Sequence, residues 1–320
     1  MNPIVQCVPN ISEGRDIGKI NYITAPLKNQ EGFKCISVEP DHDYNRSVIT
    51  LIGNPQAMIE PLIEFFRRAV EKIDMNKHQG EHARMGAVDV VPFIPISDIT
   101  IETCIEYANQ LSRIVATLFN IPIFLYAKAA TSPSRINLPD IRKGEFEGMS
   151  EKIKDSEWKP DFGPQIMHKT FGVTAIGARI PLIAYNIDLN TTDEKIANAI
   201  AKAIRQSSGG FQYIQAGPVF LDQRNHVQVT MNILDFKKNP IYRILETVRM
   251  EARRYQVLIT GSEIVGVCPK DALLDSLKYY LSVNQMPFDK TMSLSELSEE
   301  SIKYLQLRDF NVFKIIEANL

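Results

Sequence analysis

The order in which two hydrophobic periods alternate along the chain is the feature that most restricts its fold. Near the N-terminus, four short apolar runs bounded by polar or glycine residues are typical of strands. They are residues 3–8, 33–38, 46–53 and 87–96. Between them, apolar residues recur every three or four positions after Ser12, a predicted helix cap, and again after Pro55. The resulting order, β-α-β-β-α-β, is that of a ferredoxin-like split βαβ unit.

The same order of patterns returns in the second half of the chain. A further strand at 121–127 and a long irregular stretch at 131–171 come first, and the aromatic residues of that stretch favour an ordered segment. Strand and helix patterns follow at 173–178, 193–205, 211–220, 226–236, 241–254 and 256–267. The run at 173–189 can be read as one strand or as two. We predict an α+β protein of two ferredoxin-like βαββαβ halves, each a sheet covered by helices, joined after the long loop. Residues 1–178 and 179–320 would form the two subdomains.

Charge and hydropathy limit the expected partners. The 320 residues carry a net charge of -2, with 23% charged and 44% hydrophobic residues, which is the balance of an ordinary globular protein. Nucleic acid is not expected as a partner, because there is no excess positive charge to neutralise phosphates. The sequence shows neither a secretion signal nor the ~18 apolar residues of a membrane span, so we expect a cytoplasmic protein that binds no membrane. The four cysteines are far apart and are expected to be reduced and mostly buried.

The densest group of reactive side chains lies at residues 77–90, between the end of a helix and a buried strand. Taken alone, His78-x-x-Glu81-His82 matches the inverted zinc-peptidase pattern, so a zinc metallopeptidase is one alternative function. That pattern needs a helix that places both imidazoles on one face, whereas Gly80 inside the motif favours a loop. We therefore expect no metal here, and a loop whose side chains carry function.

A series of segments along the chain occurs in the order found in one known family. They are CVPNISEGRD (7–16), NR (45–46), HQGEHARMGAVDVVPFIP (78–95), FLYAKAA (124–130), IRKGEFEG (141–148), DFGP (161–164), FGVTAIGAR (171–179), QVTMNILDF (228–236) and GSEIVGVCP (261–269). Together they resemble the formiminotransferase domain of the glutamate formiminotransferase-cyclodeaminase family, from about residue 3 to residue 281. The most specific of them is GEHARMG, residues 80–86.

The resemblance implies which residues form the site. The family's catalytic histidine is the one in GEHARMG, which is His82 here. Its folate contacts fall on the segment 163–172, of which residues 165–170 match the family less closely. The matching positions are Gly163, Pro164, Phe171 and Gly172, with Phe171 as an aromatic residue where other members often carry tryptophan.

The resemblance also implies the activity. The family transfers the formimino group of N-formimino-L-glutamate to the five-position nitrogen of tetrahydrofolate, its co-substrate, giving 5-formiminotetrahydrofolate and L-glutamate in histidine degradation. The closest alternative is a glutamate formyltransferase, which moves a formyl group between N-formylglutamate and 5-formyltetrahydrofolate. A folate-binding module without catalysis is a third possibility, against which the presence of both His82 and Arg84 argues. The resemblance further implies a homodimer, no metal, and a separate cyclodeaminase that acts on the product.

Such a transfer needs a group that moves a proton and a group that favours a cation. Histidine titrates near neutral pH, so His82 can take a proton from the attacking folate nitrogen and give one to the departing amine. The amidine becomes more electrophilic when it is protonated, and a nearby carboxylate would favour that form. The candidates are Glu39, Asp41 and Glu81.

The two carboxylates of the donor call for bidentate partners. Arg46 and Arg84 lie in the matching motifs and have the planar donor geometry that carboxylates prefer. Folate brings a flat pterin and an acidic tail, for which Phe171 and Lys169 are the predicted contacts.

Overall fold

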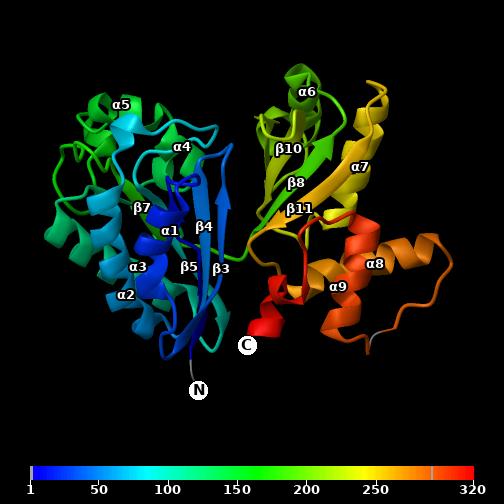
Figure 1. Cartoon of the computed structure of the whole chain (residues 1–320), viewed down its shortest axis with the longest axis horizontal. Helices are drawn as coiled ribbons and strands as arrows, with labels where there is room; N and C mark the ends of the chain where they lie inside the picture. The colour runs from blue at the N-terminus through cyan, green and yellow to red at the C-terminus, as the bar shows by residue number, and fades with distance from the viewer. Residues whose placement is uncertain (1–2, 290) are drawn as a thin grey trace. The chain divides into compact units, whose positions relative to one another are not determined.

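The computed structural model describes residues 3–289 and 291–320, and the chain divides into two compact units between Ile180 and Pro181 (Figure 1). The boundary predicted after residue 178 lies slightly earlier, at the end of strand β7 (Thr174–Ala178). The run at 173–189 contains two strands, β7 and β8 (Ile183–Leu189), and the unit boundary lies between them. Within the described ranges, no helix is long and apolar enough to cross a membrane.

The first unit contains a seven-stranded sheet. Its strands are β1 (Ile4–Cys7), β2 (Asn10–Ile11), β3 (Phe33–Asp41), β4 (Arg46–Gly53), β5 (Val88–Ser97), β6 (Ile123–Ala127) and β7. Strand β3 pairs with β4, β4 pairs with both β1 and β2, and these two short strands pair with β5, all antiparallel. Strands β7 and β6 continue the sheet beyond β5 in parallel. The predicted β-α-β-β-α-β order is present with one addition, the two-residue strand β2 after β1, and with two further strands at one edge of the sheet.

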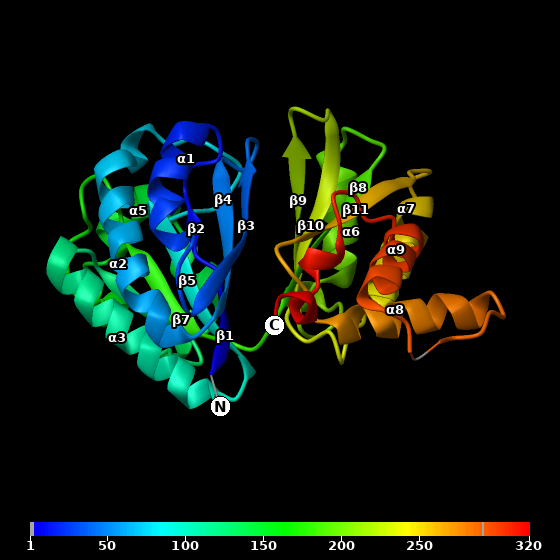
Figure 2. The same cartoon turned by 60° about the horizontal axis from the view of Figure 1, so that its bottom comes forward.

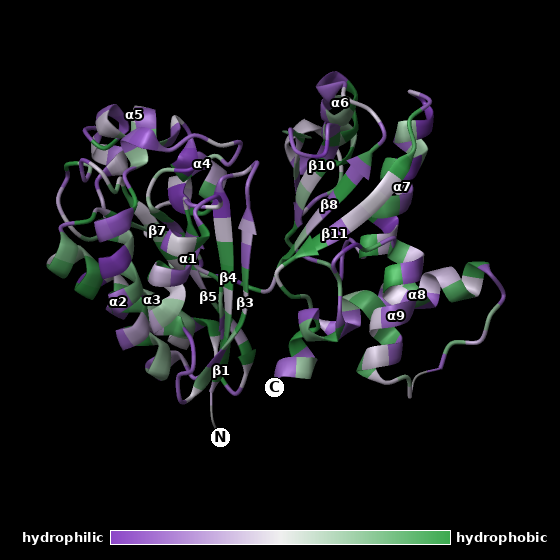
Figure 3. Cartoon of the chain, viewed as in Figure 1, coloured by the Kyte–Doolittle hydropathy of each residue, from purple (hydrophilic) through white to green (hydrophobic). Residues whose placement is uncertain are grey.

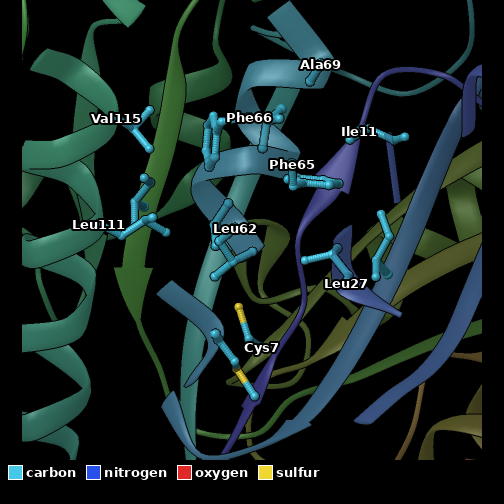
Figure 4. Packing of buried hydrophobic residues seen from close by; sticks show 14 of the residues in the cluster. Cys7, Ile11, Leu27, Leu62, Phe65, Phe66, Ala69, Leu111 and Val115 are labelled. Carbon is cyan, nitrogen blue, oxygen red and sulfur yellow. The ribbon is translucent and has the colours of Figure 1, made fainter. Parts of the chain in front are cut away.

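Three helices cover one face of this sheet, namely α1 (Ile17–Thr24), α2 (Pro55–Lys72) and α3 (Ile101–Phe119) (Figure 2). Their apolar stripes form the main core with Cys7, Ile11 and other strand residues (Figure 4). The predicted cap of α1 is wrong by four positions: the carboxylate of Asp16, and not the hydroxyl of Ser12, accepts the N–H of Lys19 in the first turn. Ser12 donates instead to the carbonyl of Gly86, at 2.8 Å.

The segment 131–171 was expected to be an ordered loop, and in the structure it contains regular elements that the sequence did not predict. It includes α4 (Leu138–Arg142), α5 (Glu145–Lys152) and short 3-10 turns at Pro133–Arg135 and Ser156–Trp158. A second apolar cluster joins α4 and α5 to residues of β5, β6 and β7 that alternate with those of the main core, so these helices cover the opposite face. The buried ion pair between Arg135 and Asp161, at 2.7 Å, holds the start of the segment to the DFGP motif.

The second unit is a four-stranded antiparallel sheet in the order β11-β8-β10-β9. Its elements after β8 are α6 (Glu194–Ile204), β9 (Ile214–Leu221), β10 (His226–Ile233), α7 (Ile241–Arg253), β11 (Ile259–Val265), α8 (Lys270–Val283) and α9 (Leu294–Leu305), with 3-10 turns at Gln206–Ser208, Val312–Lys314 and Ile316–Asn319. The helices α6 and α7 alternate hydrophobic and hydrophilic bands in Figure 3, and their buried residues share a core with one face of the sheet. The mixed α/β class with two sheets is confirmed, and the assignment of each half to the ferredoxin-like fold remains a prediction.

Candidate active site

The segment 78–86 lies directly against the turn that joins β3 to β4. The N–H of Glu81 donates to the carbonyl of Asp43 at 3.1 Å, and that of His82 points to the carbonyl of Tyr44 at 3.4 Å. Gly80 permits this approach, because a Cβ atom there would lie 2.6 Å from the carbonyl oxygen of Tyr44. The turn and the GEHARMG segment therefore form one structural unit.

The N-terminal motif VPNISEG packs on the same turn. The N–H of Gly14 donates to the side-chain oxygen of Asn45 at 2.9 Å, and a Cβ atom at Gly14 would overlap the carbonyl oxygen of Asp41. The side chain of Asn45 also donates to the carbonyl of Gln79 at 2.8 Å. Asn45 thus joins three motifs that lie far apart in the sequence, and it does so with a positive φ of 47°.

His82 is buried, with a relative exposure of 8%. Its Nδ1 atom has no hydrogen-bond partner among residues 3–289 and 291–320. Burial lowers the pKa of His82 well below its usual range, and the positive charges of Arg142 and Arg46 lower it further. The imidazole is therefore neutral at neutral pH, with one ring nitrogen that no protein group in the described chain uses.

Both ring nitrogens of His78 are engaged. Nε2 lies 2.8 Å from the carbonyl oxygen of Asn45 and must donate to it, while Nδ1 accepts from Nε of Arg84 at 3.2 Å. Burial lowers the pKa of His78, which agrees with this neutral form. His78 consequently offers no lone pair to a metal, so the zinc-ligand pair with His82 is not formed. Among the described residues, no group of three or more acidic, histidine or cysteine side chains is placed to hold a metal ion.

Arg84 is committed to two glutamates. It is buried, and its Nη1 and Nη2 atoms donate to Glu145 at 2.8 Å and to Glu147 at 2.7 Å. The N–H of Phe146 donates back to the carbonyl of Arg84 at 2.9 Å. The prediction that Arg84 receives a substrate carboxylate would require it to exchange these partners, and in this structure it holds the IRKGEFEG motif against GEHARMG.

A second ion pair, between Asp89 and Arg142, was not predicted from the sequence. Asp89 is fully buried at the start of β5, where its Oδ1 accepts the N–H of Met85 at 2.8 Å. Its Oδ2 accepts Nε of Arg142 at 2.9 Å and also the Nη2 of that residue. The sequence did contain a signal for this ion pair, namely an aspartate inside the apolar run AVDVV. A carboxylate in a buried strand requires a partner.

The sheet register brings several predicted substrate residues onto one face. Asp41 pairs directly with Arg46 across β3 and β4, and Glu39 pairs with Val48 two positions further on. Arg46 also lies over the ring of Tyr44, with 5.0 Å from its guanidinium carbon to the ring centroid. Asp41 uses Oδ1 to accept the N–H groups of Asp43 and Tyr44, which is the turn role expected of that residue type.

Glu81 does not share this position. Glu81 is exposed, whereas its neighbours His82 and Arg84 are buried. Side-chain burial therefore separates the predicted acidic residues: Glu39 and Asp41 are half-buried on the face that carries Arg46, and Glu81 faces solvent.

The residues expected to bind folate have clear local roles in the fold. Gly163 and Gly172 have positive φ angles of 84° and 85°, and a Cβ atom at Gly172 would overlap the carbonyl of Met85. The ring of Phe171 has 0% exposure and stacks on Phe66 with centroids 6.2 Å apart. No face of Phe171 is open to a pterin in this structure, so its predicted stacking role is not supported. Pro164 is half-buried beside Gly163.

A buried neutral histidine with a free ring nitrogen, close to arginine side chains, is an arrangement suited to proton transfer on an anionic substrate. The comparisons with known proteins agree with a transferase. The family model described as the formiminotransferase domain, N-terminal subdomain, matches residues 4–179, and the model described as the formiminotransferase domain matches residues 184–319. The chain belongs to the formiminotransferase family, which confirms the resemblance found in its sequence motifs.

Several relatives match over most of this chain. A glutamate formimidoyltransferase of Streptococcus pyogenes serotype M1 is 46% identical over 290 residues, which cover 91% of this chain and 97% of the relative. One from Thermoplasma acidophilum is 45% identical and covers 88% of this chain and 93% of the relative. The formimidoyltransferase-cyclodeaminase of Mus musculus is 39% identical over 88% of this chain, and the match covers 53% of that longer relative.

Proposed function

We propose that this chain is a glutamate formimidoyltransferase that transfers the formimino group of N-formimino-L-glutamate to tetrahydrofolate. The observation that carries the proposal is His82, buried in the GEHARMG motif with Nδ1 unused by any described residue. Family membership supports it, as does the match to two glutamate formimidoyltransferases over 91% and 88% of this chain. The reaction places this enzyme in histidine degradation, with tetrahydrofolate as co-substrate.

In the proposed reaction, His82 moves the proton that links the two halves of the exchange. The five-position nitrogen of tetrahydrofolate attacks the amidine carbon, and His82 accepts the proton that this nitrogen loses. The bond from the amidine carbon to the glutamate nitrogen then breaks, and His82 returns the proton to the departing amine. The products are 5-formiminotetrahydrofolate and L-glutamate. A neutral imidazole is the form that can begin this sequence, and the lowered pKa of His82 supplies it.

The acidic residues near Arg46 are proposed to act on the amidinium group. Glu39 and Asp41 share a sheet face with Arg46, and a carboxylate there would favour the protonated donor. We rank Glu81 below them, because its side chain is exposed.

For tetrahydrofolate, we retain the segment 163–172 as the proposed contact region. Gly163, Pro164 and Gly172 would offer backbone atoms to the ligand, and exposed Lys169 would receive its acidic tail. Phe171 is proposed to support this segment from the core rather than to stack on the pterin.

The wider setting of the activity is also a proposal. We propose a cytoplasmic homodimer, because the family implies a dimer and most soluble oligomers have twofold symmetry. A cyclodeaminase is expected to act on the product, in line with the name of the mouse relative.

Replacement of His82 tests the catalytic assignment. A general acid-base group contributes typically ~10²–10⁴-fold, so His82→Ala should lower kcat by about that factor while the dissociation constant of tetrahydrofolate changes little. The matched control is His42→Ala, since His42 is an exposed histidine in the neighbouring turn. Retention of more than about half of the wild-type kcat in His82→Ala would place the chemistry elsewhere.

A substrate comparison tests the donor. Wild-type enzyme is mixed with tetrahydrofolate and either N-formiminoglutamate or N-formylglutamate, and the folate product is identified by its absorption spectrum and mass. The proposal predicts 5-formiminotetrahydrofolate from the first donor at a much higher kcat/KM. Faster formation of 5-formyltetrahydrofolate from the second would instead identify a formyltransferase.

A further inference from the structure

The charges of three arginines, Arg46, Arg84 and Arg142, act on His82, and these arginines differ in how many of their N–H donors are occupied. The terminal nitrogens of Arg84 donate hydrogen bonds to Glu145 and Glu147. Nε and Nη2 of Arg142 donate hydrogen bonds to Asp89, and its Nη1 donates to no residue in the ranges that the structure describes. Nε of Arg46 is buried and has no partner within those same ranges.

Strand β2 pairs with both β4 and β5, so Arg46 on β4 lies two strands from Asp89 on β5, the residue that holds Arg142. Burial is the main cause of the lowered pKa of Arg46, and the positive charge of Arg142 lowers it further. The charges of both arginines also lower the pKa of His82, after burial. Without a bound anion, this arrangement is unfavourable for two reasons. The two positively charged guanidinium groups repel each other, and a buried N–H donor lacks a hydrogen bond. An anion between them would remove both penalties.

We propose that Arg46 and Arg142 hold one carboxylate of the donor substrate between them, next to His82, and that Asp89 is the positioning residue for Arg142. This inference rests on the proposed donor, which carries two carboxylates. Asp89 anchors Arg142 by accepting two of its N–H groups, while Oδ1 ties the same carboxylate to the N–H of Met85, three residues beyond His82. The geometry therefore couples the position of the anion site to that of the proton carrier.

The same arrangement gives the IRKGEFEG motif a function. Arg142 would contact the substrate, whereas Glu145 and Glu147 hold the motif to Arg84. Lys143, the neighbour of Arg142, is exposed and has no part in the proposed site, which makes it the matched control.

Ligand binding without catalysis tests the arginine pair. Titration calorimetry is performed with L-glutamate, with L-glutamine and with the α-amide of glutamate, on the wild type and on the Arg142→Gln and Lys143→Gln variants. Charge-assisted hydrogen bonds contribute about 1.5–3 kcal/mol, so we expect ~10–100-fold weaker glutamate binding in Arg142→Gln. The preference for glutamate over the amide that lacks the held carboxylate should fall by a similar factor, and Lys143→Gln should behave as wild type.

A second variant guards against simple misfolding. Arg142→Lys keeps the charge without the planar fork and is expected to bind glutamate with intermediate affinity. Glutamate affinity within twofold of wild type in Arg142→Gln would overturn the inference, as would a wild-type chain that does not distinguish glutamate from either amide. Failure of the wild type to transfer a formimino group, with intact discrimination of glutamate, would overturn the proposed function and leave the anion site standing.

The positioning role of Asp89 is tested by kinetics. Asp89→Asn keeps an oxygen for the N–H of Met85 but removes the charge that holds Arg142, so the KM of the donor should rise about tenfold while kcat stays within about threefold. A purely structural role would lower the amount of folded enzyme and leave the KM unchanged. An unchanged donor KM in folded Asp89→Asn would therefore reject the positioning role.

Discussion

Burial decides the ionisation of the histidine in the GEHARMG motif. An exposed histidine titrates near pH 6.5, but His82 is almost fully enclosed and stands close to Arg46 and Arg142. Desolvation and positive neighbours both disfavour the imidazolium, so the pKa of His82 moves down rather than up. The residue is consequently a ready proton acceptor at neutral pH, in keeping with the first step of the proposed reaction.

The pH dependence of kcat/KM should report this lowered pKa. Because kcat/KM follows the free enzyme, its acid limb should lie below pH 6.5 and the rate should rise with pH through the limb as His82 loses its proton. Removal of a positive neighbour in Arg142→Gln should shift the limb to higher pH. A pH series of initial rates checks both statements. A limb at or above pH 6.5 in the wild type would contradict them.

Glycine is required at one point where two site segments meet. Gly172 has a φ of 85°, and a Cβ atom there would overlap the carbonyl oxygen of Met85, three residues after His82. We expect Gly172→Ala to lower the free energy of unfolding by about 2 kcal/mol or more. Gly148 in α5 is the control, since a Cβ atom there would meet nothing within 4 Å and Gly148→Ala should stabilise by ~0.5–1 kcal/mol. Urea denaturation measures both, and a similar change of stability in the two variants would refute the steric argument.

At the scale of elements, the short helix α4 presents Arg142 to the site from its last turn. A five-residue helix has no stability of its own. Its C-terminal carbonyls are instead satisfied by Lys152 of α5, whose Nζ donates to Asp140 at 2.6 Å and to Ile141 at 2.7 Å. The same amine lies 3.8 Å from the ring centroid of Trp158. One lysine thus joins three pieces of the segment 131–171.

Removal of this lysine should loosen α4. Burial lowers the pKa of Lys152 to about 8, so the amine is still mostly charged at pH 7 and its bonds to carbonyls are charge-assisted. Lys152→Gln should lower the free energy of unfolding by about 1–3 kcal/mol and raise the KM of the donor, because Arg142 ends α4. Lys154→Gln is the control: its ion pair with Glu151 is exposed and is expected to contribute below ~1 kcal/mol. Equal losses in the two variants would show that Lys152 has no special role.

At the scale of the whole molecule, His82 lies in the first of the two units. The charged neighbours that lower the pKa of His82 most, after burial, belong to the first unit. In the second unit, a polar network lies on one sheet face, where Asp188 accepts from Gln228 at 2.8 Å and pairs with Arg308. These groups satisfy one another within the unit, which is the condition under which buried polar side chains are tolerated.

The proposed homodimer is open to a direct measurement. Light scattering at micromolar concentration should give twice the 36.2 kDa of one chain. The mass should remain constant on dilution through the range used for kinetics, because the family implies a stable assembly. The mass of a single chain at those concentrations would rule the dimer out.

The sequence by itself determined the order of the longer strands and helices, the family, and the segment that carries the reactive histidine. Each of these depends on local periods or contiguous motifs, which survive without knowledge of neighbours in space. It also predicted that Arg46 and His82 belong to one site, although only through the family resemblance.

Tertiary structure alone decided which side chains are available for chemistry. Arg84 and Arg142 both lie in motifs that match the family. Arg84 binds two glutamates more than sixty positions away, whereas Arg142 binds Asp89 and keeps an N–H donor without a partner among the described residues. From the sequence, Phe171 was expected to be a loop residue that contacts the ligand, whereas in the structure it is a fully buried part of the core. Burial and ion pairing are properties of contacts between distant segments, and those contacts follow from strand pairing and close glycine approaches that no local pattern encodes.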